Sequence, residues 1–156
     1  MNSPFGRQIK MIGQQTNLQL SEVLTKSHIP TLSIEMGLSE DNWNSKIVFQ
    51  VDPVRELPDL CRFLLGYSNQ DLVITRSMKD AKSLTLKNQK NGTYIGLYHN
   101  KSLDNDNTSS NSQSKDEKFS KILGRNQIFA LRVMALSRLA AVYSVTVTDV
   151  IEQLRY

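Results

Sequence analysis

Tyrosine and basic side chains are interleaved along one part of the sequence, between residues 67 and 101. Exposed aromatic rings stack on nucleobases and cations follow the phosphates, so this combination is typical of proteins that bind nucleic acid single strands. The residues concerned are Tyr67, Arg76, Lys79, Lys82, Lys87, Lys90, Tyr94, Tyr98 and Lys101. Strands favour tyrosine in any protein. The alternative is therefore that Tyr94 and Tyr98 are half-buried strand residues and the lysines form an ordinary solvated face.

The sequence carries no recognisable catalytic or metal-binding pattern. Its two histidines, His28 and His99, lie in unrelated segments without a cysteine or carboxylate cluster at metal-ligand spacing. The glycines are scattered singly, which excludes a glycine-rich phosphate loop. We expect no enzyme activity, no metal and no cofactor. A dispersed site remains the alternative, and a deep pocket joining His99 to clustered acids would indicate it; the available acids include Glu35, Asp41, Asp52 and Glu56.

Two further groups of residues allow two interpretations each. Trp43 is either a stacking platform or an anchor that pins a hairpin to the core, where tryptophan contributes buried area. The arginines of the segment 125–143 either contact phosphate, or lie on a solvent face or pair with acids across a subunit boundary.

Composition limits the class of protein. The chain of 156 residues fits a single domain, and its apolar fraction of 39% is too high for a disordered chain. A net charge of +4 favours a polyanionic partner. Cys61 is the one cysteine, so no intramolecular disulfide can form and a reducing compartment is expected. No apolar run reaches about 18 residues and no secretory signal is recognisable, so we expect no membrane and a cytoplasmic, or in a bacterium nucleoid-associated, location.

The elements that would position these residues fall into two similar blocks. The first block, 31–66, reads as two strands (TLSIEM and KIVFQV) followed by an apolar helix that ends at Gly66. The second, 71–143, reads as DLVITR, KSLTLK and TYIGLY, with KFSKIL as a further short strand, followed by a long apolar helix. Alternation directs Ser83, Thr85, Lys87, Tyr94, Gly96 and Tyr98 outward.

The borders of these elements are less sharply marked. Asp52 and Pro53 predict a helix start, but Pro58 would either kink this helix or mark the start of a shorter one. Asn91 and Gly92 predict a tight turn. We expect a poorly defined N-terminal segment over 1–28 and a mobile low-complexity loop over 101–118, within one domain spanning 1–156. The end of the chain predicts a short strand and a helical turn capped by Thr148.

Three segments resemble the plant Whirly single-stranded-DNA-binding proteins, over about residues 31–143. NWNSKIVFQVDPVRELPDLCRFLLG resembles the family's tryptophan-containing hairpin, strand and short helix. KSLTLKNQKNGTYIGLYHNK resembles its later lysine-rich hairpin, and FSKILGRNQIFALRVMALSRLAAVY its last strand and C-terminal helix. The family's Lys-Gly-Lys-type DNA-binding segment has only a faint counterpart in residues 6–10, and its C-terminal tail has none.

The resemblance implies an α+β fold: two antiparallel sheet-plus-helix units, sheets packed roughly orthogonally and a long C-terminal helix. It also implies a homo-oligomer, a tetramer in preference to a dimer, built on helix residues. Because that helix is apolar around much of its circumference, we expect an interface at Ile128, Phe129, Leu131, Val133, Met134, Leu136 and Leu139.

We predict a protein that binds single-stranded DNA, or RNA, with little sequence preference, in replication, recombination, repair or transcription. The alternative is a non-catalytic protein-interaction subunit with the same fold. Base stacking is expected of Tyr94 and Tyr98. Phosphate contact is expected of Lys46, Arg76, Lys79, Lys82, Lys87 and Lys90.

Overall fold

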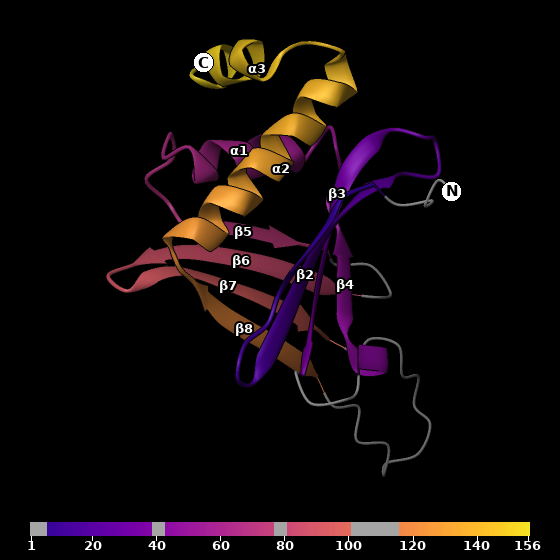
Figure 1. Ribbon diagram of the computed structural model, residues 1–156, viewed down its shortest axis with the longest axis vertical. Helices are drawn as coiled ribbons and strands as arrows, with labels where there is room; N and C mark the ends of the chain where they lie inside the picture. The colour runs from indigo at the N-terminus through magenta and orange to yellow at the C-terminus, as the bar shows by residue number, and fades with distance from the viewer. Residues whose placement is uncertain (1–5, 39–42, 77–80, 101–115) are drawn as a thin grey trace.

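The computed structural model describes residues 6–38, 43–76, 81–100 and 116–156. They form two four-stranded antiparallel sheets, and each sheet is followed in the chain by a helix. Figure 1 shows the strands of the two sheets crossing at a steep angle, with the helices grouped at one end. This is the α+β arrangement that the two sequence blocks and the resemblance predicted.

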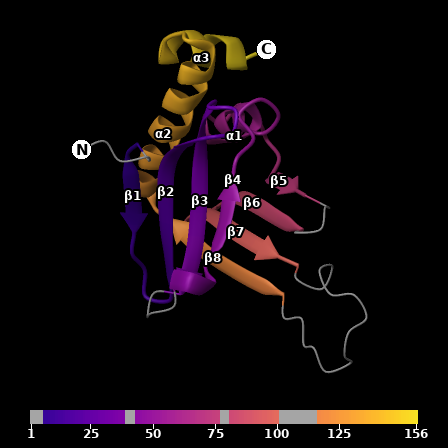
Figure 2. The ribbon, with the colours of Figure 1, turned by 90° about the vertical axis from the view of Figure 1, so that its right-hand side faces the viewer.

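The first sheet has the order β1-β2-β3-β4 and comprises β1 (Gln8–Met11), β2 (Thr16–Leu24), β3 (Pro30–Leu38) and β4 (Ile47–Gln50). A single 3-10 turn, η1 (Trp43–Ser45), precedes β4, and α1 (Leu57–Leu64) follows it. Each connection joins neighbouring strands, so the sheet is a simple meander, as Figure 2 shows from the side.

The second sheet repeats this plan with the order β5-β6-β7-β8. Its strands are β5 (Leu72–Thr75), β6 (Lys82–Gln89), β7 (Gly92–His99) and β8 (Glu117–Leu123). The long helix α2 (Arg125–Tyr143) follows, and a short helix, α3 (Val147–Leu154), ends the chain. α2 packs on β3 and on both other helices.

The core lies between the inner faces of the two sheets and under the helices. Strand alternation buries the inward residues, which are Leu32, Ile34, Met36, Ile47 and Phe49 in the first sheet and Leu84, Leu86, Ile95 and Leu97 in the second. Burying one such side chain stabilises a fold by about 1.5–3 kcal/mol. This core fixes which face of each sheet remains outside.

The first helix begins later than Asp52 and Pro53 indicated. Asp52 does act as a turn-forming acceptor, since its Oδ1 accepts hydrogen bonds from the amides of Val54 (2.9 Å) and Arg55 (2.8 Å). The helix itself begins at Leu57 and has Pro58 in its first turn, where no amide donor is required. The shorter-helix interpretation is therefore correct. Gly66 ends the segment with a φ of 78°, as expected.

The N-terminal segment is better structured than we expected. Residues 8–11 and 16–24 form β1 and β2, and Leu18 and Leu20 are fully buried. These strands contain few apolar residues, and their order comes from pairing: β1 pairs with β2, and β2 pairs with β3 through the hairpin at residues 25–29. Residues 101–115 of the expected loop lie outside the described residues, whereas Glu117 and Lys118 already belong to β8.

The β6–β7 turn and the end of the chain also differ from expectation. The β6–β7 turn has Lys90 and Asn91 at its centre, because Gln89 pairs with Gly92. Residues 147–154 form a helix, so the expected helical turn is present but longer, and its cap is Thr146 rather than Thr148. Residues 144–146, before it, form no strand. The Thr146 hydroxyl accepts from the Asp149 amide (3.1 Å), while the Asp149 carboxylate accepts from the Thr146 amide (3.3 Å).

No single helix in the described parts of the chain is long and apolar enough to cross a membrane; α2 and α3 pass that test only as a pair, bent by 96°.

Candidate nucleic-acid interface

The outer face of the second sheet carries the aromatic and basic residues that the sequence directed outward. Its outward positions on β6, β7 and β8 lie in register, so that they form rows across the sheet. One row is Lys87, Tyr94 and Ile122; the next is Thr85, Gly96 and Ser120; the third is Ser83, Tyr98 and Lys118. All nine positions are described, and none is acidic. We call this set the tyrosine face.

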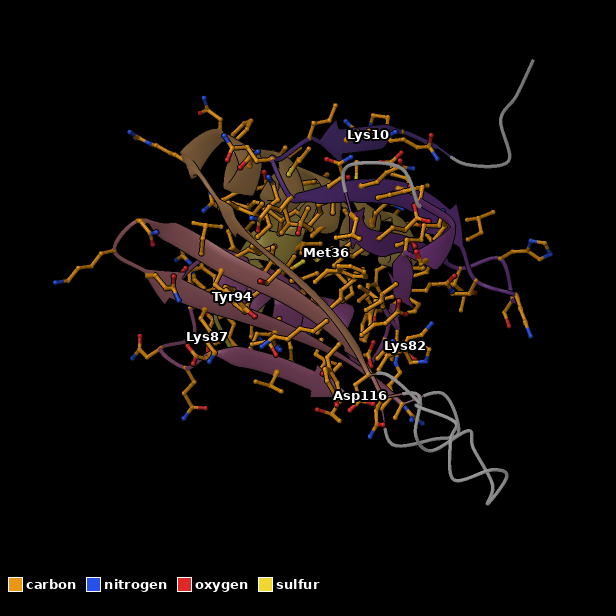
Figure 3. All side chains as sticks on the ribbon, turned by 90° about the horizontal axis from the view of Figure 1, so that it is seen from below. Lys10, Met36, Lys82, Lys87, Tyr94 and Asp116 are labelled. Atoms are coloured by element: carbon orange, nitrogen blue, oxygen red, sulfur yellow. The ribbon has the colours of Figure 1, made fainter. Side chains whose placement is uncertain are left out.

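Tyr94 lies along the strand over Gly96. A Cβ built at Gly96 would come within 2.7 Å of Tyr94 Oη and 3.0 Å of its Cε1, so the phenol occupies the space that a side chain would fill. The ring is half-buried and has Lys87 and Ile122 as its cross-strand neighbours. Figure 3 shows Lys87 and Tyr94 close together on the second sheet, with Lys82 and Asp116 towards its other end. The half-buried interpretation of Tyr94 is therefore compatible with a stacking role.

Tyr98 is held by an acid at the start of β8. Its hydroxyl donates a hydrogen bond of 2.6 Å to Asp116 Oδ2. That hydrogen bond raises the pKa of Tyr98, since the phenol must remain protonated to donate it. At neutral pH Tyr98 is therefore a neutral ring whose position is fixed at one end of the tyrosine face.

Two exposed lysines flank the rings. Lys87 is opposite Tyr94, and Lys118 is opposite Tyr98. Lys118 was missed as a candidate because we assigned it to the loop 101–118. The alternation of KFSKIL, which begins at Lys118 and directs it to the same face as Ser120 and Ile122, was the signal that could have found it. Lys90 is also exposed, at the tip of the β6–β7 hairpin.

Arg76 and Lys82 lie elsewhere, between the two sheets. Both donate to main-chain oxygens on the free edge of β4: Arg76 Nη2 to Gln50 (2.6 Å) and Lys82 Nζ to Val48 (3.0 Å). Arg76 also pairs with Glu56, and its guanidinium lies 4.1 Å from the centroid of the Phe49 ring. These two cations cover a strand edge that would otherwise be unpaired.

Of the remaining predicted phosphate contacts, Lys46 is separated from the tyrosine face. Lys46 lies on the first sheet, where its ammonium pairs with Glu35 at 2.9 Å. Lys79 lies outside the described residues. The structure therefore brings together Lys87, Tyr94 and Tyr98, with Lys90 at the adjoining hairpin tip, and leaves Lys46, Arg76 and Lys82 in other places.

Two of the three arginines of α2 bind main-chain oxygens of their own chain, whereas Arg125 is exposed, as expected for a solvent face. Arg132 donates through Nε to the Leu64 oxygen at 2.9 Å, which ties α2 to the end of α1. Arg138 donates to the oxygens of Thr31 (2.9 Å) and Val23 (2.7 Å), which ties α2 to the first sheet. Both side chains satisfy main-chain acceptors of their own chain.

The expected interface residues on α2 divide by exposure. Leu131, Met134, Leu136 and Leu139 are buried inside the chain, so their apolar surface belongs to its own core. Phe129 and Val133, one helical turn apart, are 61% and 40% exposed, and Ile128 is partly buried. The helix is apolar on several sides because it contacts β3, α1 and α3 together.

Among the described residues there is no group of three or more histidine, cysteine or acidic side chains that could hold a metal ion. A cavity of about 490 Å³ contains Asp52 and Glu56 but not His99. Both acids are engaged there, Asp52 with main-chain amides and Glu56 with Arg76. This cavity lacks the combination that would indicate a dispersed active site.

No protein-family model and no curated protein sequence matches the chain. Its structure, in contrast, is similar to solved structures of Whirly proteins. That of the plant transcriptional regulator PBF-2 matches with a TM-score of 0.66 at 9% identity, over 92% of this chain and 85% of that one. The crystal structure of WHY3 from Arabidopsis thaliana matches with a TM-score of 0.67 at 11% identity, over 99% and 97%. The chain, with its two crossed four-stranded sheets and long helix α2, therefore has the Whirly fold.

Proposed function

We propose that the chain binds single-stranded nucleic acid, DNA in preference to RNA, on the tyrosine face. The observation that carries this proposal is the pair of rings on β7, Tyr94 and Tyr98, each with a lysine as its cross-strand neighbour. Four residues along a strand span about 13 Å, so the two rings can take different bases of one strand.

Binding combines two physical contributions. Bases stack on the phenol rings, and a ring accepts every base because each has a π-face, so little sequence preference results. Phosphates approach Lys87, Lys118 and Lys90 and release counterions. None of the nine positions of the tyrosine face is acidic, and the acid that contacts the face is Asp116, at its end beside Tyr98. Arg76 and Lys82 support the fold instead, since both are engaged with β4.

The protein acts without catalysing a reaction and as a homo-oligomer, a tetramer in preference to a dimer. Phe129 and Val133 support assembly, because a large exposed ring beside a second apolar side chain on one helix face is suited to a subunit contact. Among replication, recombination, repair and transcription, the similarity to a plant transcriptional regulator favours transcription.

The second candidate is a protein-interaction subunit, and the same exposed Phe129 favours it. Gel-shift titrations with single-stranded DNA, single-stranded RNA and duplex DNA at two salt concentrations separate the two. We expect single strands to bind more tightly than duplex, and the affinity to fall steeply with salt. Absence of binding at low salt would favour the interaction subunit.

A further inference from the structure

The tip of the β6–β7 hairpin carries the one asparagine–glycine pair of the sequence, Asn91 and Gly92. Lys90 and Asn91 form the turn, and Gln89 pairs with Gly92 across it. Both turn residues are exposed, so the Asn91 amide is accessible to water. Gly92 has a φ of 141°, and a Cβ there would lie 2.5 Å from the Leu123 oxygen, so the turn requires glycine at this position.

An asparagine followed by glycine is prone to lose its side-chain amide, because glycine has no side chain that shields its main-chain nitrogen. The Gly92 nitrogen loses its proton and attacks Cγ of Asn91, so that a C–N bond closes a cyclic imide while the Cγ–Nδ2 bond breaks and ammonia leaves. Water then opens the imide by cleaving a C–N bond at either carbonyl. One opening gives aspartate, and the other gives isoaspartate, in which the main chain runs through the former side chain. The reaction consumes water, releases ammonia and needs no oxidant.

The hairpin tip can provide the freedom that this cyclisation needs. The Asn91–Gly92 peptide has to rotate until its nitrogen faces Cγ, which opens the last pair of the hairpin, Gln89 with Gly92. Opening at the end of a hairpin costs little, because few contacts hold it. One residue further in, the Thr93 hydroxyl donates a hydrogen bond of 3.0 Å to the Asn88 side chain. This bond can keep the rest of the hairpin in register while the tip opens.

We propose that Asn91 is a site of spontaneous modification, and that its conversion to aspartate or isoaspartate weakens binding on the tyrosine face. The effect on binding rests on the proposed function, whereas the conversion does not. Either product puts a negative charge beside Lys90, well within the Debye length of about 8 Å of a phosphate bound there. Isoaspartate also adds a carbon to the main chain before Gly92. This shifts Gly92 against Leu123 and moves Tyr94, two residues further along β7.

Incubation at neutral and at mildly alkaline pH, followed by peptide mapping with mass spectrometry, tests the conversion. Asn91 should convert faster at the higher pH, since imide formation needs a deprotonated nitrogen, and enzymatic methylation of isoaspartate identifies that product. Asn69 and Asn126 are internal controls that should stay intact, because both are exposed but are followed by glutamine. If Asn91 stays intact while a synthetic peptide of residues 87–95 converts completely, the folded hairpin protects the pair and the proposal is wrong.

Two variants separate the new charge from the altered main chain. Asn91→Asp carries the charge on a normal main chain, so it should weaken single-strand binding about 2- to 5-fold at low salt and little at high salt, where the charge is screened. Asn91→Gln closes to an imide far more slowly, so its affinity should match the parent and stay constant on incubation. The converted parent should lose more affinity than Asn91→Asp, and part of that loss should persist at high salt because the Tyr94 ring has moved. Equal affinity of fresh and fully converted parent would overturn the effect on binding.

The mass measurement and the binding measurement distinguish failure of this inference from failure of the proposed function. If the fresh protein binds no single strand, the proposed function is wrong, and the mass of the peptide that contains Asn91 still decides whether the residue converts. If the fresh protein binds but incubation weakens the parent and Asn91→Gln equally, the loss has another origin and the assignment to Asn91 is wrong. Loss in the parent alone, in step with conversion of Asn91, supports both parts of the proposal.

Discussion

The Tyr94 hydroxyl lies where a side chain at residue 96 would begin: a Cβ on Gly96 would come 2.7 Å from it. The glycine thereby lets the ring lie along β7, with Lys87 and Ile122 as its cross-strand neighbours. The absence of a side chain at Gly96 thus sets the position of the Tyr94 ring. A substitution at Gly96 would therefore alter the tyrosine face without changing any charge.

Replacing that glycine should affect binding and not folding. Gly96→Ala pushes the Tyr94 ring aside, and we expect single-strand affinity to fall by about 1 kcal/mol or more, within the range for one base–ring stack. The backbone at Gly96 is not in the left-handed region, so alanine is tolerated there and stability should hold. Gly124→Ala is the matched control, because a Cβ there meets nothing within 4 Å. Fluorescence anisotropy and thermal unfolding measure both quantities, and equal affinity in the two variants would contradict this role of Gly96.

Arg76 should matter for stability and not for phosphate binding. Its loss removes the partner of Glu56 and the donor to the Gln50 oxygen. Arg76→Ala should therefore lower the free energy of unfolding by about 1–3 kcal/mol, the usual result of leaving such groups unpaired. The exposed neighbour Arg55→Ala serves as the control, with little effect. Urea titration measures the loss. A stable Arg76→Ala variant whose salt slope drops by about 0.7 would instead mark Arg76 as a phosphate contact.

The Tyr98–Asp116 hydrogen bond should be visible in a pH titration. Because the carboxylate accepts from the phenol, the pKa of Tyr98 is raised above its ordinary value. This contact is fully present below the pKa of a free tyrosine and is lost as pH rises through the folded pKa. In Asp116→Asn the phenolate should form at lower pH, as followed by ultraviolet absorbance. The variant should also bind single strands slightly more tightly, since one repelling charge is removed; weaker binding would indicate that Asp116 has to hold the ring in place.

Cys61 should be inert in the folded protein. Burial raises the pKa of its thiol to about 12, so at neutral pH almost no thiolate is present. Ellman's reagent should react with the native chain only as fast as the core opens, and completely in concentrated urea. Rapid reaction of the native protein would show that α1, which carries Cys61, is not packed as described.

Elements could be predicted from the sequence where local pattern and tertiary role agree. Alternation in TLSIEM and TYIGLY identified β3 and β7, and placed Tyr94 and Tyr98 outward, because the period of a strand is local information. β1 and β2 were uncertain, since the pairing of β1 with β2 and of β2 with β3, rather than a clear pattern of their own residues, fixes them.

The candidate site was harder to predict than the fold. Arg76 and Lys82 look like free cations in the sequence, but their partners on β4 lie 26 and 34 residues away. Lys118 was missed because it was assigned to the loop 101–118, and its register with Tyr98 depends on the pairing of β8 with β7. Apolar residues of α2 suggested a subunit surface, yet most of them face the chain's own core. Each of these differences depends on which distant element packs against the residue.

The central claim is that single strands bind across the tyrosine face, and salt-dependent anisotropy of three proteins tests it most directly. Parent, Tyr94→Ala and Lys87→Ala are titrated with one fluorescent single-stranded oligonucleotide over a series of salt concentrations, with Tyr156→Ala and Lys26→Ala as exposed controls. Tyr94→Ala should lose about 1–3 kcal/mol with its salt slope unchanged, because a ring and no charge is removed. Lys87→Ala should lower the slope by about 0.7, the contribution of one phosphate contact in a single strand. Parent-like affinity and slope in both variants would contradict the claim.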